Sequence, residues 1–492
     1  MTHNTVVTSW SSAGALLLTA IQPVSADERS ETYPPETFQY AVALNKNYVR
    51  MVLELTGVFS VGLVWYITNT EIGQDYNFKY NWKTFRQKLT GDALGLDTNH
   101  LGTNFIGHPL GGSAYYWVAR GNRLGIAESA GIAVGGSLLW EYFGEVSEIV
   151  SLNDMIVTPL AGIAIGEAFT QLGAFFDRSS PAWHNRVLSI LLTPFKNLND
   201  ALDGASLGRS QLDQRGFPAD EWHQFDLNTG AAWLSQHAQN GAANFGAVRF
   251  SMNSQLARLP AYTRPGRAAL WFSDAQVSRI TIDGAFDTRA LVDFNLATQV
   301  VMVGYYTGAK THSTRIGWSM GFQYTIHDFD RDRTKPVDRI ASIEPLGLSF
   351  EQRAQLGATR FSALLDAGGD FGGVVPYALA DYAGDSSGLP DVTRAHGYYF
   401  GLGGRVTATL IGQLESCELR LLVRFEGYRS LESDPRMYDQ RSFMSARASC
   451  GVPSTVLRLA FFLERRARAG DLQDAHAQRS ELTSGLELGV RL

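Results

Sequence analysis

The sequence predicts an α+β fold, in which an N-terminal helical domain is followed by a C-terminal antiparallel transmembrane β-barrel of about 12 strands. Before about residue 220, apolar side chains recur with the period of a helix; from about residue 221, they recur at every second position. In the second half, charged and apolar residues alternate over about 10 residues per strand, as in barrels with an apolar outer face and a polar lumen.

Composition narrows the class of protein. The chain has 492 residues, enough for more than one domain, and only 18% of them are charged, which is low for a soluble protein. A net charge of −6 is not the footprint of a nucleic-acid binder, so we expect no nucleic-acid partner. Two cysteines exclude a zinc site built from thiolates.

The first 26 residues have the pattern of a secretory signal peptide, with an apolar run and small residues at Val24-Ser25-Ala26. The segment lacks Lys and Arg, so an ordinary disordered N-terminus is the alternative. Residues 27–36 are a polar linker. Export would deliver the chain to the bacterial outer membrane, with membrane lipid and the barrel assembly machinery as partners.

Residues 37–200 are the predicted helical domain, and residues 201–220 connect it to a barrel over 221–492. The apolar run from Met51 to Ile67 has 17 residues, just short of the about 20 that span a bilayer. We interpret it as a buried or interfacial helix, with a membrane span as the alternative.

Three helices are predicted in the centre of this domain, over 109–120, 126–148 and 151–177. Pro109 is favoured at a first helical position, with His108 as the cap, and Ser151 to Asp154 resembles a capping box. Glycines four residues apart let helix backbones approach closely: Gly131 with Gly135, and Gly162 with Gly166.

Counting back from the C-terminus gives twelve strands. With an even number of strands, the start of the first strand and the end of the last strand both lie on the periplasmic side. They are 221–235, 244–257, 266–282, 286–307, 312–328, 355–366, 371–382, 397–411, 416–428, 442–450, 455–467 and 478–492. Residues 329–354 become an external loop, and 367–370 a short turn. Strands of a soluble β-sandwich also alternate between apolar and polar residues, so such a sandwich is the alternative to the barrel.

The hairpin over 416–450 has a self-consistent register. If Cys417 faces Cys450, then Leu419 meets Ala448, and all four side chains lie on the apolar face. A cross-strand disulfide can form in an oxidising periplasm. The alternative is that both cysteines are simply small outward-facing residues.

Several motifs carry a resemblance to a known family. They are Asn104 to Tyr116 with His108 inside it, Gly136 to Tyr142, Glu145, Glu148, Ser151 to Asp154, and Thr158-Pro159. Together they resemble the family of domain of unknown function 3943, over about 97–180. The resemblance implies an exported bacterial envelope protein and no known reaction. The chain is also distantly similar to the VanZ-like membrane proteins.

Helical spacing places Glu141, Glu145 and Glu148 on one face, where three acids repel one another unless cations, protons or donors intervene. Candidate catalytic residues are therefore His108, Glu141, Glu145 and Asp154. Candidate metal ligands are His108, Glu141, Glu145 and Glu148, so a divalent metal is the one cofactor left open.

A structural interpretation competes with this one. In it, Ser151, Asp154 and His108 cap helices, and Glu141 pairs with Arg120 or Arg123. The protein would then have a structural or transport role, with its helices plugging the lumen or packing at the periplasmic mouth. The alternative function is an outer-membrane enzyme, a hydrolase or acyl transferase acting on lipid or lipopolysaccharide.

Overall fold

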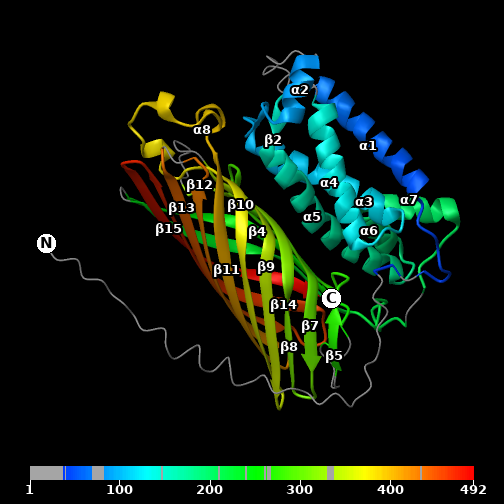
Figure 1. Ribbon diagram of the computed structural model, residues 1–492. Helices are drawn as coiled ribbons and strands as arrows, with labels where there is room; N and C mark the ends of the chain where they lie inside the picture. Colours follow the sequence, from blue (N-terminus) through cyan, green and yellow to red (C-terminus); the bar gives the residue numbers. More distant parts are fainter. Residues whose placement is uncertain are drawn as a thin grey trace.

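The computed structural model describes residues 37–492 except 39, 69–81, 146–147, 209–210, 239–240, 260–261, 263–267, 330–336 and 433–434. The predicted signal peptide and the predicted linker over 27–36 both lie outside the described residues. The described chain forms a bundle of helices and a long β-barrel that lie side by side (Figure 1).

The barrel is a closed antiparallel ring of twelve strand positions, because β7 pairs with β8 at the two ends of the strand order. One position is shared by the short β5 (Ala268–Phe272) and β6 (Val277–Phe286), which both pair with β7. The other strands are β3 (Trp222–Ala238), β4 (Gly241–Ala257), β7 (Leu291–Gly308), β8 (His312–His327), β9 (Asp338–Leu356), β10 (Thr359–Val374), β11 (Tyr399–Leu414), β12 (Cys417–Ser430), β13 (Met437–Gly451), β14 (Leu457–Leu472) and β15 (Ala475–Arg491). The predicted fold class is confirmed.

Two errors in the predicted strands cancel in the count. Most of the expected external loop over 329–354 is strand β9, and the expected turn over 367–370 lies inside strand β10. Gly368 does not turn the chain; a Cβ there would lie 2.6 Å from the side chain of Glu344, so the glycine makes room for a buried acid. The turn between β9 and β10 is at Gly357, which has a φ of +60°.

The hairpin of β12 and β13 has the predicted register, and Cys417 and Cys450 form a disulfide. Outward-facing Leu419 and Phe425 are exposed, whereas inward-facing Glu418 and Glu426 are buried. Such a wall, with apolar residues outside and charged residues inside, is typical of a barrel that sits in a bilayer.

Ion pairs fill much of the lumen. Arg249 contacts Glu464 at 2.7 Å and Glu487 at 3.4 Å, and Arg468 contacts Asp338 at 3.0 Å. A cavity of about 360 Å³ opens at the end where β3 begins. The arginines in its lining are Arg353, Arg360, Arg420, Arg458 and Arg491.

The helical bundle is built around the 27-residue helix α5 (Leu152–Arg178), most of which is buried. Around it lie α1 (Tyr48–Thr68), α2 (Trp82–Thr90), α3 (His108–Gly121), α4 (Ile126–Leu139), α6 (Trp183–Leu192) and α7 (Pro194–Asp203). The closest crossing is between α3 and α5, where a Cβ on Gly162 would lie 2.4 Å from the backbone of Gly112. The other predicted glycine pair has no such role, since a Cβ on Gly131 or Gly135 would meet nothing within 4 Å.

The bundle packs on the outside of the barrel. On the outer face of β8, Ile316 is 43% exposed, whereas Phe322 is 3% exposed and belongs to the core that includes residues of α5. Helix α5 contacts strands β6 to β9, and Figure 1 shows the helices beside that wall. The expectation of a plug or a periplasmic-mouth domain is therefore wrong. Charged side chains already occupy the lumen, and the apolar outer wall buries the apolar face of α5.

Helix α5 follows this wall from one end of the barrel to the other. Near its C-terminal end, the ring of Phe175 packs on Phe225 at the start of β3, with centroids 5.3 Å apart. Its N-terminal end lies by the long segment between β10 and β11, where Tyr398 accepts a hydrogen bond from Asn104.

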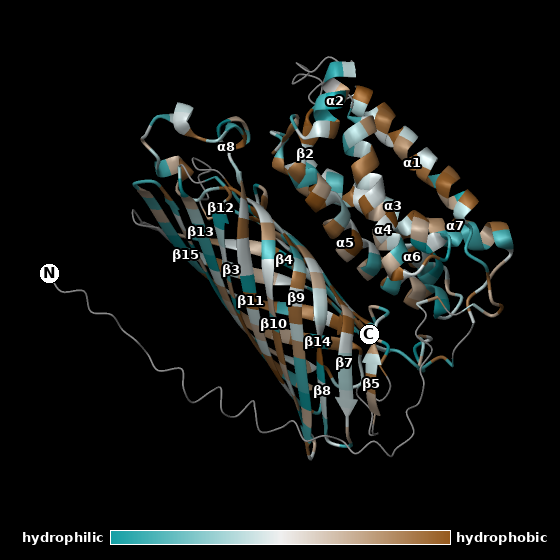
Figure 2. Ribbon diagram, viewed as in Figure 1, coloured by the Kyte–Doolittle hydropathy of each residue, from teal (hydrophilic) through white to brown (hydrophobic). Residues whose placement is uncertain are grey.

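Helices α1 and α5 are each long and apolar enough to cross a membrane. In α1, only 11% of the most apolar window is buried, so Met51 to Ile67 do not form a buried helix; the interfacial helix and the membrane span stay predictions. Its surface carries exposed Val52, Val61 and Trp65, and Figure 2 shows α1 as largely hydrophobic.

Candidate functional site

Three chain segments bring the predicted polar residues together. A π-helical turn (Thr103–Gly107) leads into α3, which starts at His108 with Pro109 in its first turn. A second π-helical turn (Trp140–Gly144) follows α4; it contains Glu141 and is followed directly by Glu145. Helix α5 starts after Ser151, whose hydroxyl accepts a hydrogen bond from the backbone N–H of Asp154 at 3.2 Å. The predicted cap at Ser151 is therefore present.

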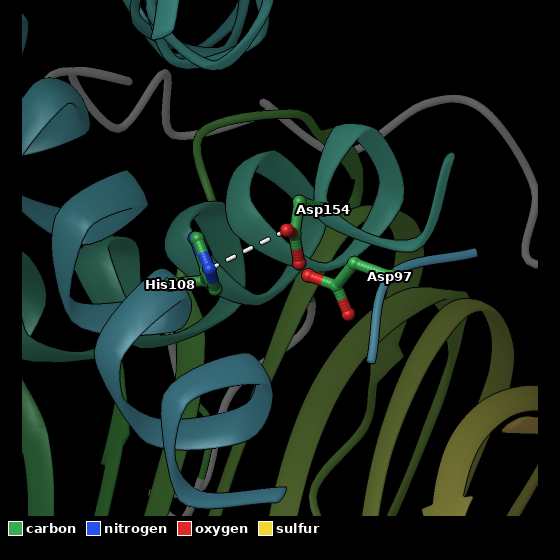
Figure 3. Close-up of side chains that lie close together, drawn as sticks. All are labelled: Asp97, His108 and Asp154. Atoms are coloured by element: carbon green, nitrogen blue, oxygen red, sulfur yellow. Dashed lines mark ion pairs between the residues drawn. The ribbon is translucent and has the colours of Figure 1, made fainter. Parts of the chain in front are cut away.

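His108 and Asp154 face each other, with Nε2 and Oδ2 3.4 Å apart (Figure 3). His108 is not the predicted helix cap, because no side-chain cap is formed at the start of α3. Its imidazole points across to α5 instead. Both Nε2 of His108 and Oδ2 of Asp154 are buried and lack a hydrogen-bond partner among the described residues.

Asp97 completes this group and was not predicted. Its carboxylate accepts hydrogen bonds from the amides of Asn99 at 2.8 Å, Asn104 at 2.7 Å and Asn153 at 3.2 Å. Its backbone N–H donates to Asn153 Oδ1 at 2.9 Å. Asp97 lies in a loop before the helices, where no spacing pattern marks it. Asn99 and Asn104, close to it in the chain, were the signal that could have marked it.

Glu141 and Glu145 lie at the other side of Asp154. Glu141 accepts from the backbone N–H of Ser151, and Glu145 from the indole of Trp140, both at 2.9 Å. Lys88 from α2 is buried beside them, but its ammonium donates to their backbone carbonyls, at 2.9 and 2.6 Å.

His108 and the four acids thus form two groups of three residues that share Asp154, each with ligand atoms within 4.8 Å of one another. One is Asp97, His108 and Asp154; the other is Glu141, Glu145 and Asp154. Glu148 belongs to neither group and accepts a hydrogen bond from Tyr66 at 2.9 Å. The π-helical turn ends the regular helix before Glu148, so the predicted stripe of three acids is broken.

Burial shifts the proton affinities of these groups. It raises the pKa of Glu141 to about 8 and that of Glu145 well above its usual range, and it lowers the pKa of His108. Desolvation favours the neutral form in each case. The site therefore combines a neutral imidazole with carboxyl groups that resist ionisation.

The alternative pairing of Glu141 with an arginine is wrong. Arg120 binds Glu167 at 3.0 Å inside the bundle, and Arg123 contacts Asp203 at 2.5 Å. The first pair links α3 to α5, and the second links the turn after α3 to α7. Neither arginine contacts Glu141.

The surface around the site is apolar. The His108 side chain is 11% exposed, and its neighbours Ile106 and Leu110 are 43% and 50% exposed. On α5, Leu152 and Ile156 are exposed on either side of buried Asp154. Any molecule that reaches His108 from outside must therefore pass over apolar side chains.

A closed barrel with an apolar outer wall and an ion-paired lumen defines an outer-membrane-type β-barrel protein, here with helices on the wall. Residues 93–195 match the family model described as "Domain of unknown function (DUF3943)". The chain therefore carries this domain, and the resemblance drawn from its motifs is confirmed.

Outer-membrane proteins are among the solved structures that this chain resembles in fold. A loop-deletion mutant of OmpT from Vibrio cholerae is 7% identical, with 56% of this chain and 100% of that chain covered and a TM-score of 0.22. The NanC porin is 9% identical, covering 53% and 98%, with a TM-score of 0.24. The β domain of the Bordetella autotransporter BrkA is 12% identical, covering 53% and 98%, with a TM-score of 0.20. No curated protein matches.

Proposed function

We propose that this protein is an outer-membrane enzyme that hydrolyses, or transfers an acyl group from, a membrane lipid. The observation that carries this proposal is the position of the cluster around His108. It is a buried polar site in a domain with an apolar surface, attached to the outer wall of a barrel. A substrate that reaches it from that side comes from the bilayer.

The cluster contains the groups that such a reaction needs. A neutral imidazole at His108 can accept a proton from an attacking water or hydroxyl, and the carboxyl group of Asp154 faces its Nε2 atom at 3.4 Å. A protonated carboxyl at Glu141 or Glu145 can return a proton to the leaving group. General acid–base catalysis of this kind contributes typically about 10²- to 10⁴-fold to the rate.

The position along the barrel supports a lipid of the outer leaflet. The chain enters the barrel at the end where β3 begins, which would be the periplasmic end of an exported protein. His108 and Asp154 lie toward the opposite end, beside Tyr398 of the segment before β11. Lipopolysaccharide occupies that leaflet. Export by the predicted signal peptide and insertion by the barrel assembly machinery are parts of the same proposal.

A transport role has weaker support. Buried pairs such as Arg249–Glu464 and Arg468–Asp338 cross the lumen, and the cavity of about 360 Å³ lies at one end only of the part described. A solute would have to displace these pairs to pass.

The test compares outer-membrane lipids, by mass spectrometry, from bacteria that lack the gene and carry wild type, His108→Ala or Asp154→Asn. We expect wild type to change the lipid profile and both variants to lose that change. Glu128→Gln is the control, because this acid on α4 pairs with Lys46 at the surface. A heat-modifiable gel shift verifies that each barrel has assembled. Identical lipid profiles with and without wild type contradict the proposal.

A further inference from the structure

We propose that the cluster binds a divalent transition-metal cation through Asp97, His108 and Asp154. The inference deepens the proposed function, since it concerns the same site, but cation binding can be measured without any lipid substrate. Three independent features of the structure support it.

The first feature is an excess of buried acids. Asp154, Glu141, Glu145 and Asp97 have exposed fractions of 0%, 1%, 5% and 9%. Lys88 is a buried cation beside them in the described part of the chain, and its two hydrogen bonds go to backbone carbonyls. Several carboxylates in one apolar bundle are costly unless a cation or protons neutralise them.

The second feature is a pair of facing atoms that lack partners. Oδ2 of Asp154 and Nε2 of His108 are 3.4 Å apart, and neither makes a hydrogen bond within the described chain. Two ligand atoms that each lie about 2.1 Å from a tetrahedral ion are about 3.4 Å apart. The fully buried Asn104 also has an unpartnered carbonyl oxygen, and its amide nitrogen is bonded to Asp97.

The third feature is the support behind the ligands. Asn153 donates to Oδ1 of Asp154 at 2.9 Å, which leaves Oδ2 directed at His108. Asn99 and Asn104 hold the carboxylate of Asp97. Hydrogen bonds of this kind orient the ligands of metal sites. Figure 3 shows the carboxylates of Asp97 and Asp154 turned toward each other and toward the imidazole.

The donor set selects the class of cation. Two carboxylates and one imidazole suit Zn²⁺, Mn²⁺ or Fe²⁺, whereas Ca²⁺ and Mg²⁺ favour ligand sets of oxygen alone. Asp154 also belongs to the group with Glu141 and Glu145, so its carboxylate can bridge to a second cation. A cation held here would take up the Nε2 lone pair of His108, and it would supply the acidification of a bound water that the imidazole otherwise supplies as a base.

The experiment uses the full-length protein in detergent, stripped with a chelator and titrated separately with Zn²⁺ and Mn²⁺. We expect wild type to bind at least one equivalent, and His108→Ala and Asp154→Asn to bind at least about 10-fold more weakly. The electron paramagnetic resonance spectrum of bound Mn²⁺ should change in the Asp97→Asn variant. Glu141→Gln combined with Glu145→Gln should remove only a second equivalent.

The matched control is His476→Ala, which removes a histidine that contacts Asp471 at 2.7 Å on the surface. It should bind cations as wild type does. Equal binding by wild type and Asp154→Asn, with both folded by circular dichroism, overturns the inference. Tight binding with no effect on lipids contradicts only the proposed activity. A lipid change that survives removal of the cation contradicts a role for the cation in the reaction and leaves the proposed activity standing.

Discussion

Gly112→Ala should separate helices α3 and α5. A Cβ at this position would lie 1.8 Å from the carbonyl oxygen of Thr158 and 3.3 Å from the Cα of Gly162. Both contacts are with backbone, so no side chain can rotate away. Overpacking of this kind costs about 1 to 3 kcal/mol, and a clash with backbone belongs at the upper end. Alanine recovers about 0.5 to 1 kcal/mol of helix propensity, which leaves a net loss of about 2 kcal/mol.

Gly111→Ala is the control, because a Cβ on Gly111 meets nothing within 4 Å. It should gain about 0.5 to 1 kcal/mol, so the two neighbouring variants should differ by about 3 kcal/mol. Urea unfolding in detergent, followed by circular dichroism at a helical wavelength, measures the difference. Because α3 carries His108 and α5 carries Asp154, cation binding should weaken in Gly112→Ala as well. Equal stability of the two variants refutes the close crossing of α3 and α5.

Two other substitutions test the ion pairs and the disulfide. Glu167→Gln leaves Arg120 charged and buried without its partner, so the bundle should lose about 3 to 5 kcal/mol of unfolding free energy in the same urea experiment; a loss below about 1 kcal/mol would show that the pair is solvated. Replacing Cys417 and Cys450 by Ser opens a loop with a sequence separation of 33, which should destabilise the barrel by about 3 to 4 kcal/mol. A reducing agent should lower the stability of wild type by the same amount and leave the double variant unchanged.

The sequence alone determined the two-part fold and much of the site. The change from a helical period to alternation marks where the helices end and the strands begin, because each period reflects local backbone geometry. The alternation was consistent with Cys417 facing Cys450, and the structure has that register. His108, Glu141, Glu145 and Asp154 were singled out because charged or polar side chains in an apolar bundle are costly unless they have partners, and the structure brings them together around Asp154.

Long-range neighbours decided the rest. Glu148 leaves the group because a π-helical turn interrupts the regular spacing, and Asp97 joins it from a loop without a pattern. The sequence predicted a turn at Gly368. In the structure, Glu344 on the adjacent strand fills the space that a side chain at this position would need.

Tertiary structure also decided where the helices sit. Apolar side chains on α5 could be removed from water inside an apolar lumen, in a bilayer or against a barrel wall, because the hydrophobic effect is not directional. In this protein, charged residues already occupy the lumen, so the helices bury their apolar faces on the outer wall. That packing places His108 and Asp154 beside the barrel instead of inside it.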